Sequence, residues 1–148
     1  MRTSISKEVE FDTGHRVPDH QSKCYNPHGH RYRVRATCEG QVVNEAGSAD
    51  NGMLVDFSDL KRWLTEYVHD RFDHAFVVYA DDVTMRHALT TDPLWNVVVV
   101  NYTPTAENLA RDIFVRLAPI IESHWRGNMT LTKIELWETP TSVAVVER

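Results

Sequence analysis

The sequence predicts one α+β domain spanning residues 1–148, in which an antiparallel sheet carries two helices on one face. Segments near both ends of the chain alternate polar and apolar residues, which is the period of a half-buried strand. Two interior segments instead repeat apolar residues with the period of an amphipathic helix. A chain of 148 residues can bury one hydrophobic core, and we find no repeat, low-complexity segment or linker that would divide it.

The first half of the chain begins with two predicted strands. Residues 3–12 alternate and should form a strand that ends before Gly14, and a polar loop follows over 18–26. Residues 28–43 alternate again and predict a long second strand with a bulge or bend at Gly40, in which Cys38 is a small packing residue. The Gly-, Ser-, Asn- and Asp-rich segment 44–52 is typical of a turn. The two strands are therefore candidates for antiparallel neighbours.

A helix is expected next, with Asp56 or Ser58 as its N-cap and an end near His69. Its apolar stripe would consist of Phe57, Leu60, Trp63, Leu64, Tyr67 and Val68. Helical periodicity breaks in the segment 70–79. Residues 81–94 are expected to form a loop that can hold a short helix, and residues 95–102 a buried third strand.

The last third of the chain predicts a second helix and a hairpin. Thr105 is the natural N-cap after Pro104, and Glu107 lies in the first turn, where the helix dipole favours a carboxylate. The apolar stripe continues to about Trp125, with a kink at Pro119. Segments 131–138 and 143–147 then read as two strands around a turn at 139–142.

Composition restricts the class of partner. The net charge of −5 argues against nonspecific nucleic-acid binding, although a local cationic pocket for a phosphorylated small molecule remains compatible with it. The two cysteines, Cys24 and Cys38, do not make a disulfide framework and favour a reducing, cytoplasmic location. We expect no membrane partner, because the N-terminus lacks the apolar region of a signal peptide and no stretch is long enough to span a bilayer.

The motif that carries chemistry is Cys24-Tyr-Asn-Pro-His28-Gly-His30. His28 and His30 are two residues apart, so on a strand both imidazoles point to the same face and can reach one metal ion. His15 offers a third imidazole, although a histidine at that position is more often an ordinary loop residue. Three histidines without a fourth protein ligand would describe a catalytic zinc site with an open position. If Cys24 were a ligand instead of a free loop thiol, the site would be closed and structural.

Six motifs in one order resemble the 6-pyruvoyl tetrahydropterin synthase superfamily. They are Gly14-His15-Arg16, Cys24-x3-His28-Gly29-His30-x-Tyr32, the segments Gly52–Lys61 and Pro104–Ala110, the pair Asp73-His74, and Glu138-Thr139-Pro140. Each motif alone is weak, but together they extend over nearly the whole chain. The chain is most similar to the bacterial branch that makes 6-carboxy-5,6,7,8-tetrahydropterin for 7-deazaguanine (queuosine) biosynthesis. The three residues between Cys24 and His28 favour this branch, because the pyruvoyl-forming enzymes usually have a longer gap.

The resemblance implies roles for individual residues. His15, His28 and His30 would bind Zn²⁺, and Cys24 would be the general base. Asp73 and His74 would form a second acid/base unit, although the neighbouring His69-Asp70 has the same composition and an exposed polar turn is the plain alternative. Glu138 would anchor the pterin, or else be an outward-facing strand residue. Thr105 would line the pterin pocket, or serve only as a helix cap.

The function that the resemblance implies is a zinc-dependent lyase. It would convert 7,8-dihydroneopterin triphosphate to 6-carboxy-5,6,7,8-tetrahydropterin and release acetaldehyde and triphosphate. The resemblance also implies a tunnelling fold, in which the sheets of several subunits close into a barrel in a homohexamer built as a dimer of trimers, with active sites at subunit interfaces. One alternative is the sister 6-pyruvoyl tetrahydropterin synthase activity, and another is a zinc-binding module without catalysis.

Overall fold

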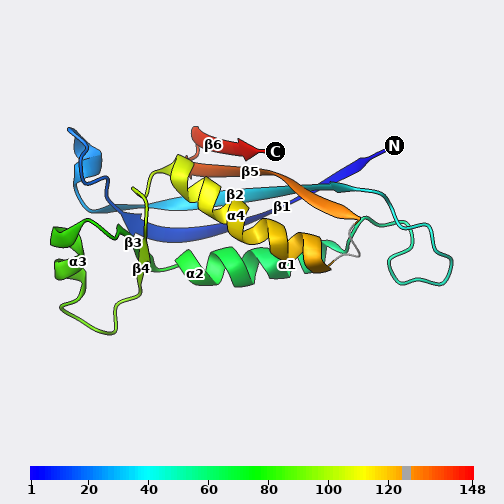
Figure 1. Ribbon diagram of the computed structural model, residues 1–148, viewed down its shortest axis with the longest axis horizontal. Coiled ribbons are helices and arrows are strands. Elements are labelled where there is room, and N and C mark those ends of the chain that lie inside the picture. Colours follow the sequence, from blue (N-terminus) through cyan, green and yellow to red (C-terminus); the bar gives the residue numbers. More distant parts are fainter. Residues whose placement is uncertain (125–127) are drawn as a thin grey trace.

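Two long strands form the centre of the sheet. The computed structural model describes residues 1–124 and 128–148, and in it β1 (Thr3–His15) and β2 (His28–Gly40) pair antiparallel along their full length (Figure 1). This confirms the predicted pairing. β1 extends three residues beyond the predicted end at 12, and β2 stops at Gly40 and not at Val43. The register irregularity predicted at Gly40 occurs instead between Thr37 and Cys38, opposite β5.

The complete sheet is mixed, with the strand order β4-β3-β1-β2-β5-β6. β5 (Met129–Thr139) pairs antiparallel with β2, and β6 (Ser142–Glu147) pairs antiparallel with β5. On the other side, β3 (Ala75–Tyr79) is parallel to β1, and β4 (Val97–Val100) is parallel to β3. The predicted α+β class is confirmed. The prediction of a wholly antiparallel sheet is wrong at the β3–β4 edge, where one strand had not been anticipated.

The first helical region is longer than predicted. α1 (Phe57–Leu64), the π-helical segment η2 (Thr65–His69) and α2 (Asp70–Phe72) follow one another without a break. The Asp56 side chain accepts a hydrogen bond from the Ser58 amide at 2.7 Å, which confirms the predicted cap. Phe57 and Tyr67, assigned to the apolar stripe, are exposed, whereas the other four members of the stripe are buried.

Two more helices complete the fold. α3 (Val83–Leu89) confirms the short helix expected in segment 81–94, and α4 (Ala106–His124) runs through Pro119. The predicted end of this helix at Trp125 lies outside the described residues. The strand predicted at 95–102 is shorter than expected, and it is an edge strand whose Val99 is half exposed.

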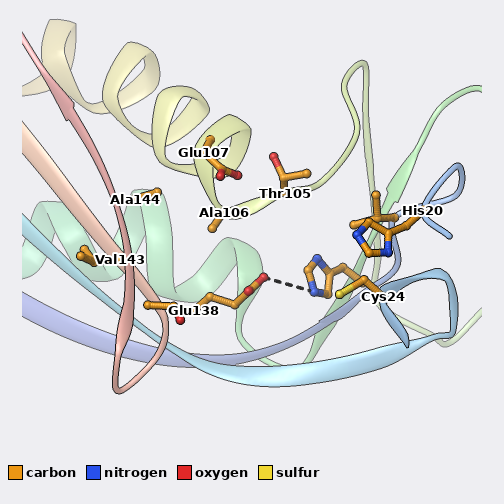
Figure 2. Close-up of a pocket in the computed structure, with 11 residues that line it drawn as sticks. His20, Cys24, Thr105, Ala106, Glu107, Glu138, Val143 and Ala144 are labelled. Carbon is orange, nitrogen blue, oxygen red and sulfur yellow. Dashed lines mark ion pairs between the residues drawn. The ribbon is translucent and has the colours of Figure 1, made fainter. Parts of the chain in front are cut away.

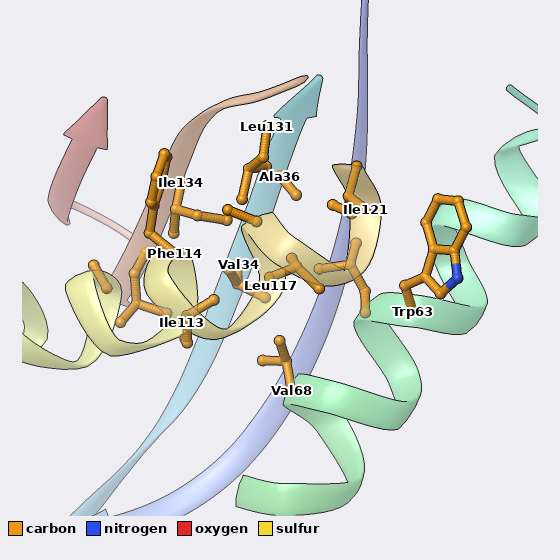
Figure 3. Packing of buried hydrophobic residues seen from close by; sticks show 14 of the residues in the cluster. Val34, Ala36, Trp63, Val68, Ile113, Phe114, Leu117, Ile121, Leu131 and Ile134 are labelled. Carbon is orange, nitrogen blue, oxygen red and sulfur yellow. The ribbon is translucent and has the colours of Figure 1, made fainter. Parts of the chain in front are cut away.

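The core lies between one face of the sheet and the helices. Alternate residues of β2, including Val34, Ala36 and Cys38, are fully buried and face the helices. Figure 3 shows Ile113 and Leu117 of α4 packed above this face, with Val68 of η2 beside them. No helix of the described residues is long and apolar enough to cross a membrane. The end of the β1–β2 pair, where His15 lies opposite His28, is outside this hydrophobic core.

Candidate active site

Three imidazoles meet at the end of the β1–β2 pair. His15 lies opposite His28 and Thr13 lies opposite His30, so strand alternation places all three imidazoles on the helix-covered face of the sheet. One ligand atom from each histidine lies within 4.8 Å of the others, and the Nε2 atoms of His15 and His28 are 3.1 Å apart. His15 is buried, whereas His28 and His30 are partly exposed.

Backbone carbonyls orient two of these rings. The Nδ1 of His15 lies 2.6 Å from the carbonyl oxygen of Pro104, and the Nδ1 of His28 lies 2.7 Å from that of Asn26. A carbonyl oxygen can only accept, so both Nδ1 atoms must donate, and the Nε2 atoms of the neutral rings are then unprotonated. Two unprotonated nitrogens 3.1 Å apart repel each other unless a proton or a cation lies between them. Histidines that ligate metals are typically oriented in this way by a hydrogen bond from the second ring nitrogen.

Burial favours the neutral form of two of these imidazoles. Desolvation lowers the pKa of His15, although its hydrogen bond to Pro104 and the charge of Glu138 oppose that effect. Desolvation also lowers the pKa of His30, again against the attraction of Glu138. Neutral imidazole is the state that binds a metal ion. The chemistry of this donor set therefore fits Zn²⁺, which accepts imidazole nitrogen readily.

Glu138 lies beside the three histidines. Its Oε1 is 3.6 Å from His15 Nε2 and 3.8 Å from His30 Nε2. The Tyr32 hydroxyl donates to the same oxygen at 3.3 Å, and burial raises the pKa of Tyr32 far above its usual value, so the phenol stays protonated and can act as a donor. Glu138 is thus an inward-facing carboxylate held by a buried tyrosine, and the outward-facing alternative is wrong.

A cavity of about 250 Å³ opens next to the cluster. Figure 2 shows Cys24 and His20 at one end of it, Thr105 and Glu107 at the start of α4, and Glu138 on the strand opposite. The lining is completed by His15, Val17, Ala106 and the β6 residues from Ser142 to Ala144. A cavity that combines apolar walls with a thiol, a hydroxyl and carboxylates beside convergent imidazoles is a suitable place for a small-molecule substrate.

Cys24 reaches this cavity from a short 3₁₀ turn, η1 (Lys23–Tyr25). Its carbonyl accepts a hydrogen bond from the Val17 amide at 2.8 Å, which ties the loop to the residues just after His15. Among the described residues, the group that could hold a metal contains the three histidines and not Cys24. The thiol therefore lines the cavity without closing the metal site.

His74 lines a different depression, and Asp73 contacts its imidazole. Asp73 Oδ2 accepts from His74 Nδ1 at 2.7 Å, and Asp73 Oδ1 accepts from the Asp12 amide at 2.9 Å. These bonds lower the pKa of Asp73, the Asp12 amide contributing most, while the bond that His74 donates to Asp73 raises the pKa of His74. The depression that contains His74 shares no lining residue with the Cys24 cavity, so one chain does not bring Cys24 and His74 into a common pocket.

Backbone geometry favours Asp73-His74 over the neighbouring His69-Asp70. His74 is the one described non-glycine residue with a positive φ, 55°, and its amide donates to the Asp12 carbonyl at 2.7 Å. Such a conformation is sparsely populated and often accompanies a functional role. His69 contacts Asp70 at 3.1 Å but has no comparable tie to β1.

Thr105 combines a cap with a place in the cavity lining. Its Oγ1 accepts from the Asn108 amide at 3.4 Å at the start of α4, and it also lines the cavity. Sequence reasoning missed three further residues here. Tyr32 was part of the His30-x-Tyr32 motif but had no assigned role, His20 lies in the loop that carries Cys24, and Glu107 was regarded only as a helix-dipole residue.

Comparison with known proteins identifies the family. The family model described as 6-pyruvoyl tetrahydropterin synthase matches residues 4–148, and the chain belongs to this family. It is 36% identical over 142 residues to the 6-carboxy-5,6,7,8-tetrahydropterin synthase of Haemophilus influenzae, covering 93% of this chain and 94% of that protein. The protein of the same name from Synechocystis sp. is 31% identical over 140 residues, covering 95% and 89%.

Solved structures support the fold. The 6-pyruvoyl tetrahydropterin synthase of Plasmodium vivax superposes with a TM-score of 0.73 at 18% identity, covering 100% of this chain and 98% of that one. The Caenorhabditis elegans enzyme of the same name gives 0.67 at 21% identity, covering 100% and 96%. The chain thus has the tunnelling fold and belongs to a family of pterin-processing enzymes.

Proposed function

We propose that the protein is a zinc-dependent 6-carboxy-5,6,7,8-tetrahydropterin synthase. It would convert 7,8-dihydroneopterin triphosphate to the carboxypterin and release acetaldehyde and triphosphate. The observation that carries this proposal is the convergence of three imidazoles, two of them oriented by backbone carbonyls, beside a cavity that also holds a thiol and a carboxylate. The relatives that carry this enzyme name match most of the chain.

His15, His28 and His30 would hold the metal. Bound Zn²⁺ would polarise the oxygens of the substrate side chain and make them more acidic. The carbonyls of Pro104 and Asn26 fix the ring orientations that this binding needs. Because Cys24 is outside the group of possible ligands, a coordination position would remain for substrate.

Cys24 and Glu138 would act directly on the substrate. Cys24 lines the cavity beside His15, so its thiolate could take a proton from a side chain bound near the metal. Glu138 faces the same cavity and could accept two N–H donors of a 2-amino-4-oxo pterin ring. The Tyr32 hydroxyl would hold that carboxylate in place, since it donates to one of the oxygens.

Asp73 and His74 would complete the site from a neighbouring subunit. The depression that His74 lines is separate from the Cys24 cavity, so the two halves of the acid/base machinery would meet only if subunits pack against each other. This arrangement agrees with a homohexamer whose active sites lie at subunit interfaces. Mixing the inactive variants Cys24→Ala and His74→Ala during refolding should restore part of the activity, because some hybrid interfaces would carry both intact groups. No recovery in hybrids of confirmed mixed composition would contradict shared sites.

The sister activity, 6-pyruvoyl tetrahydropterin synthase, is the nearest alternative. The solved structures with that name are 18–21% identical to this chain, which supports the fold alone. The three-residue gap between Cys24 and His28, and relatives at 28–36% identity named for the carboxy-forming reaction, favour the chosen branch. The product would then enter 7-deazaguanine (queuosine) biosynthesis in the cytoplasm, where two free cysteines such as Cys24 and Cys38 are ordinary.

Replacing Cys24 by Ala tests the catalytic proposal against a zinc-binding module without activity. The variant should keep the zinc content of the parent protein and lose turnover, since the thiol is outside the ligand group. Cys38→Ala is the matched control, because that thiol is fully buried in the core and away from the cavity. Loss of zinc from Cys24→Ala would instead indicate a closed structural site.

A further inference from the structure

A buried ion pair connects the end of β1 to α3. The Arg16 guanidinium donates from both Nε and Nη2 to the two carboxylate oxygens of Asp82, with the Nε contact at 2.6 Å. Both residues are buried, at 9% and 6% exposure, although they are 66 positions apart in the chain. Burying a charged pair is weak evidence for a gain in stability, and fixing one specific arrangement is a better-supported role for such a pair.

The same pair has two further contacts. Asp82 is the N-cap of α3, where its Oδ1 also accepts from the Met85 amide at 3.1 Å. On the other side, the Arg16 guanidinium lies over the Tyr25 ring, 5.0 Å from its centroid, in a cation–π contact. Arg16 thus contacts the segment around α3 and the loop of η1 at once.

These contacts hold Cys24 from both sides. Tyr25 follows Cys24 directly in η1. The Cys24 carbonyl accepts a hydrogen bond from the amide of Val17, the residue after Arg16. His15 immediately precedes Arg16. The segment from His15 to Val17 therefore carries the buried imidazole and is also hydrogen-bonded to the backbone of Cys24. Arg16, Tyr25 and Asp82 do not themselves line the cavity.

We infer that the Arg16–Asp82 pair is a positioning device, which holds the Cys24 loop over the histidine cluster through the Tyr25 ring. The segment around α3, which does not itself line the cavity, thereby controls the placement of the thiol. The consequence for turnover rests on the proposed function. The consequence for the placement of Cys24 does not, so the two can be measured separately.

The first experiment measures alkylation of Cys24 by iodoacetamide in the zinc-loaded full-length chain. Cys24 is the reporter because the only other thiol, Cys38, is fully buried. Tyr25→Leu removes the ring that Arg16 covers and should increase the alkylation rate severalfold, because the released loop exposes the thiol. Tyr25→Phe keeps the ring face and should restore most of the parent behaviour. Tyr67→Leu, at another exposed tyrosine, is the matched control.

A second substitution addresses the ion pair itself. Asp82→Asn keeps a good N-cap side chain but loses the charge that pairs with Arg16. Asp56→Asn is its matched control, because Asp56 is also a helix N-cap and makes no ion pair with an arginine of the described residues. Asp82→Asn should accelerate alkylation of Cys24, and Asp56→Asn should leave it unchanged.

Turnover provides the second readout. With 7,8-dihydroneopterin triphosphate as substrate, Tyr25→Leu and Asp82→Asn should each lower kcat about tenfold with little change in KM, because a misplaced base slows the chemical step. An alkylation rate of Cys24 in Tyr25→Leu equal to that of the parent would overturn the inference. A change in the alkylation rate or in kcat that occurs in Asp82→Asn but not in Tyr25→Leu would overturn it as well. A parent protein that does not turn over this substrate would refute the proposed function, and the alkylation rates would still decide the positioning role.

Discussion

Zinc should stabilise the folded chain through the three histidines, and His28→Ala should abolish most of that effect. The Nε2 of His28 lies 3.1 Å from that of His15, and its Nδ1 is oriented by Asn26, so it has the geometry of a ligand. His28 is partly exposed, so its replacement leaves the core intact. The substitution also removes the repulsion between two unprotonated nitrogens, and we expect the metal-free variant to be at least as stable as the metal-free parent.

The magnitude follows from ligand linkage. Free zinc buffered at about 100 times its Kd adds about 2.7 kcal/mol to the free energy of unfolding. For a chain of this length, about 2–4 °C per kcal/mol gives a rise in Tm of about 5–11 °C. If losing one ligand weakens binding about 100-fold, the same zinc adds only about 0.4 kcal/mol, or about 1–2 °C.

The assay is thermal unfolding at fixed protein concentration, with and without buffered zinc. His87→Ala is the matched control, because this histidine is exposed on α3 and outside the cluster, and it should keep the full zinc-dependent rise. An undiminished zinc-dependent rise in His28→Ala would refute the proposed coordination by the three histidines.

Three further predictions follow from the contacts described above. Asp73→Asn should lower the pKa of His74 toward its ordinary value, because the bond that His74 donates to the Asp73 carboxylate is the main cause of the raised pKa; NMR titration of the imidazole measures this, and an unchanged pKa would contradict it. The stabilisation that this bond gives is complete below the unfolded pKa of about 6.5 and is lost as the pH rises through the higher folded pKa. Leu117→Ala should cost about 2–5 kcal/mol in urea unfolding, because Leu117 is fully buried. Val115→Ala, on the exposed side of the same helix, should stay within about 0.5 kcal/mol, and equal costs would show that the assigned core is wrong. Gly14→Ala should destabilise the chain by about 1–3 kcal/mol, because its Cβ would meet the Phe76 ring at 2.6 Å; a cost that persists in full after Phe76→Leu would argue against this clash.

The sequence predicted the convergence of the three histidines well, because local rules decide most of it. Strand alternation places His28 and His30 on one face whatever the rest of the chain does. His15 joins them because β1 continues past Gly14, a short extension of a strand that the alternating pattern had already indicated. The pairing of the two strands then brings His15 opposite His28.

Features that depend on long-range packing were less predictable. β3 is a short, nearly continuous apolar run, as buried parallel strands often are, so it lacks the alternation that identifies a strand. Tyr67 lies in the π-helical segment η2, whose wider turn shifts the side chains away from a stripe counted at 3.6 residues per turn. The contact between Tyr32 and Glu138 joins residues 106 positions apart, and no local pattern indicates it.

The most direct test of the central claim is a product assay. Zinc-loaded protein would be incubated with 7,8-dihydroneopterin triphosphate, the pterin products resolved, and acetaldehyde measured in the same reaction. Our account predicts 6-carboxy-5,6,7,8-tetrahydropterin together with acetaldehyde. A pyruvoyl-tetrahydropterin without acetaldehyde would assign the protein to the sister activity, and neither product from folded, metal-loaded protein would contradict the proposed reaction altogether.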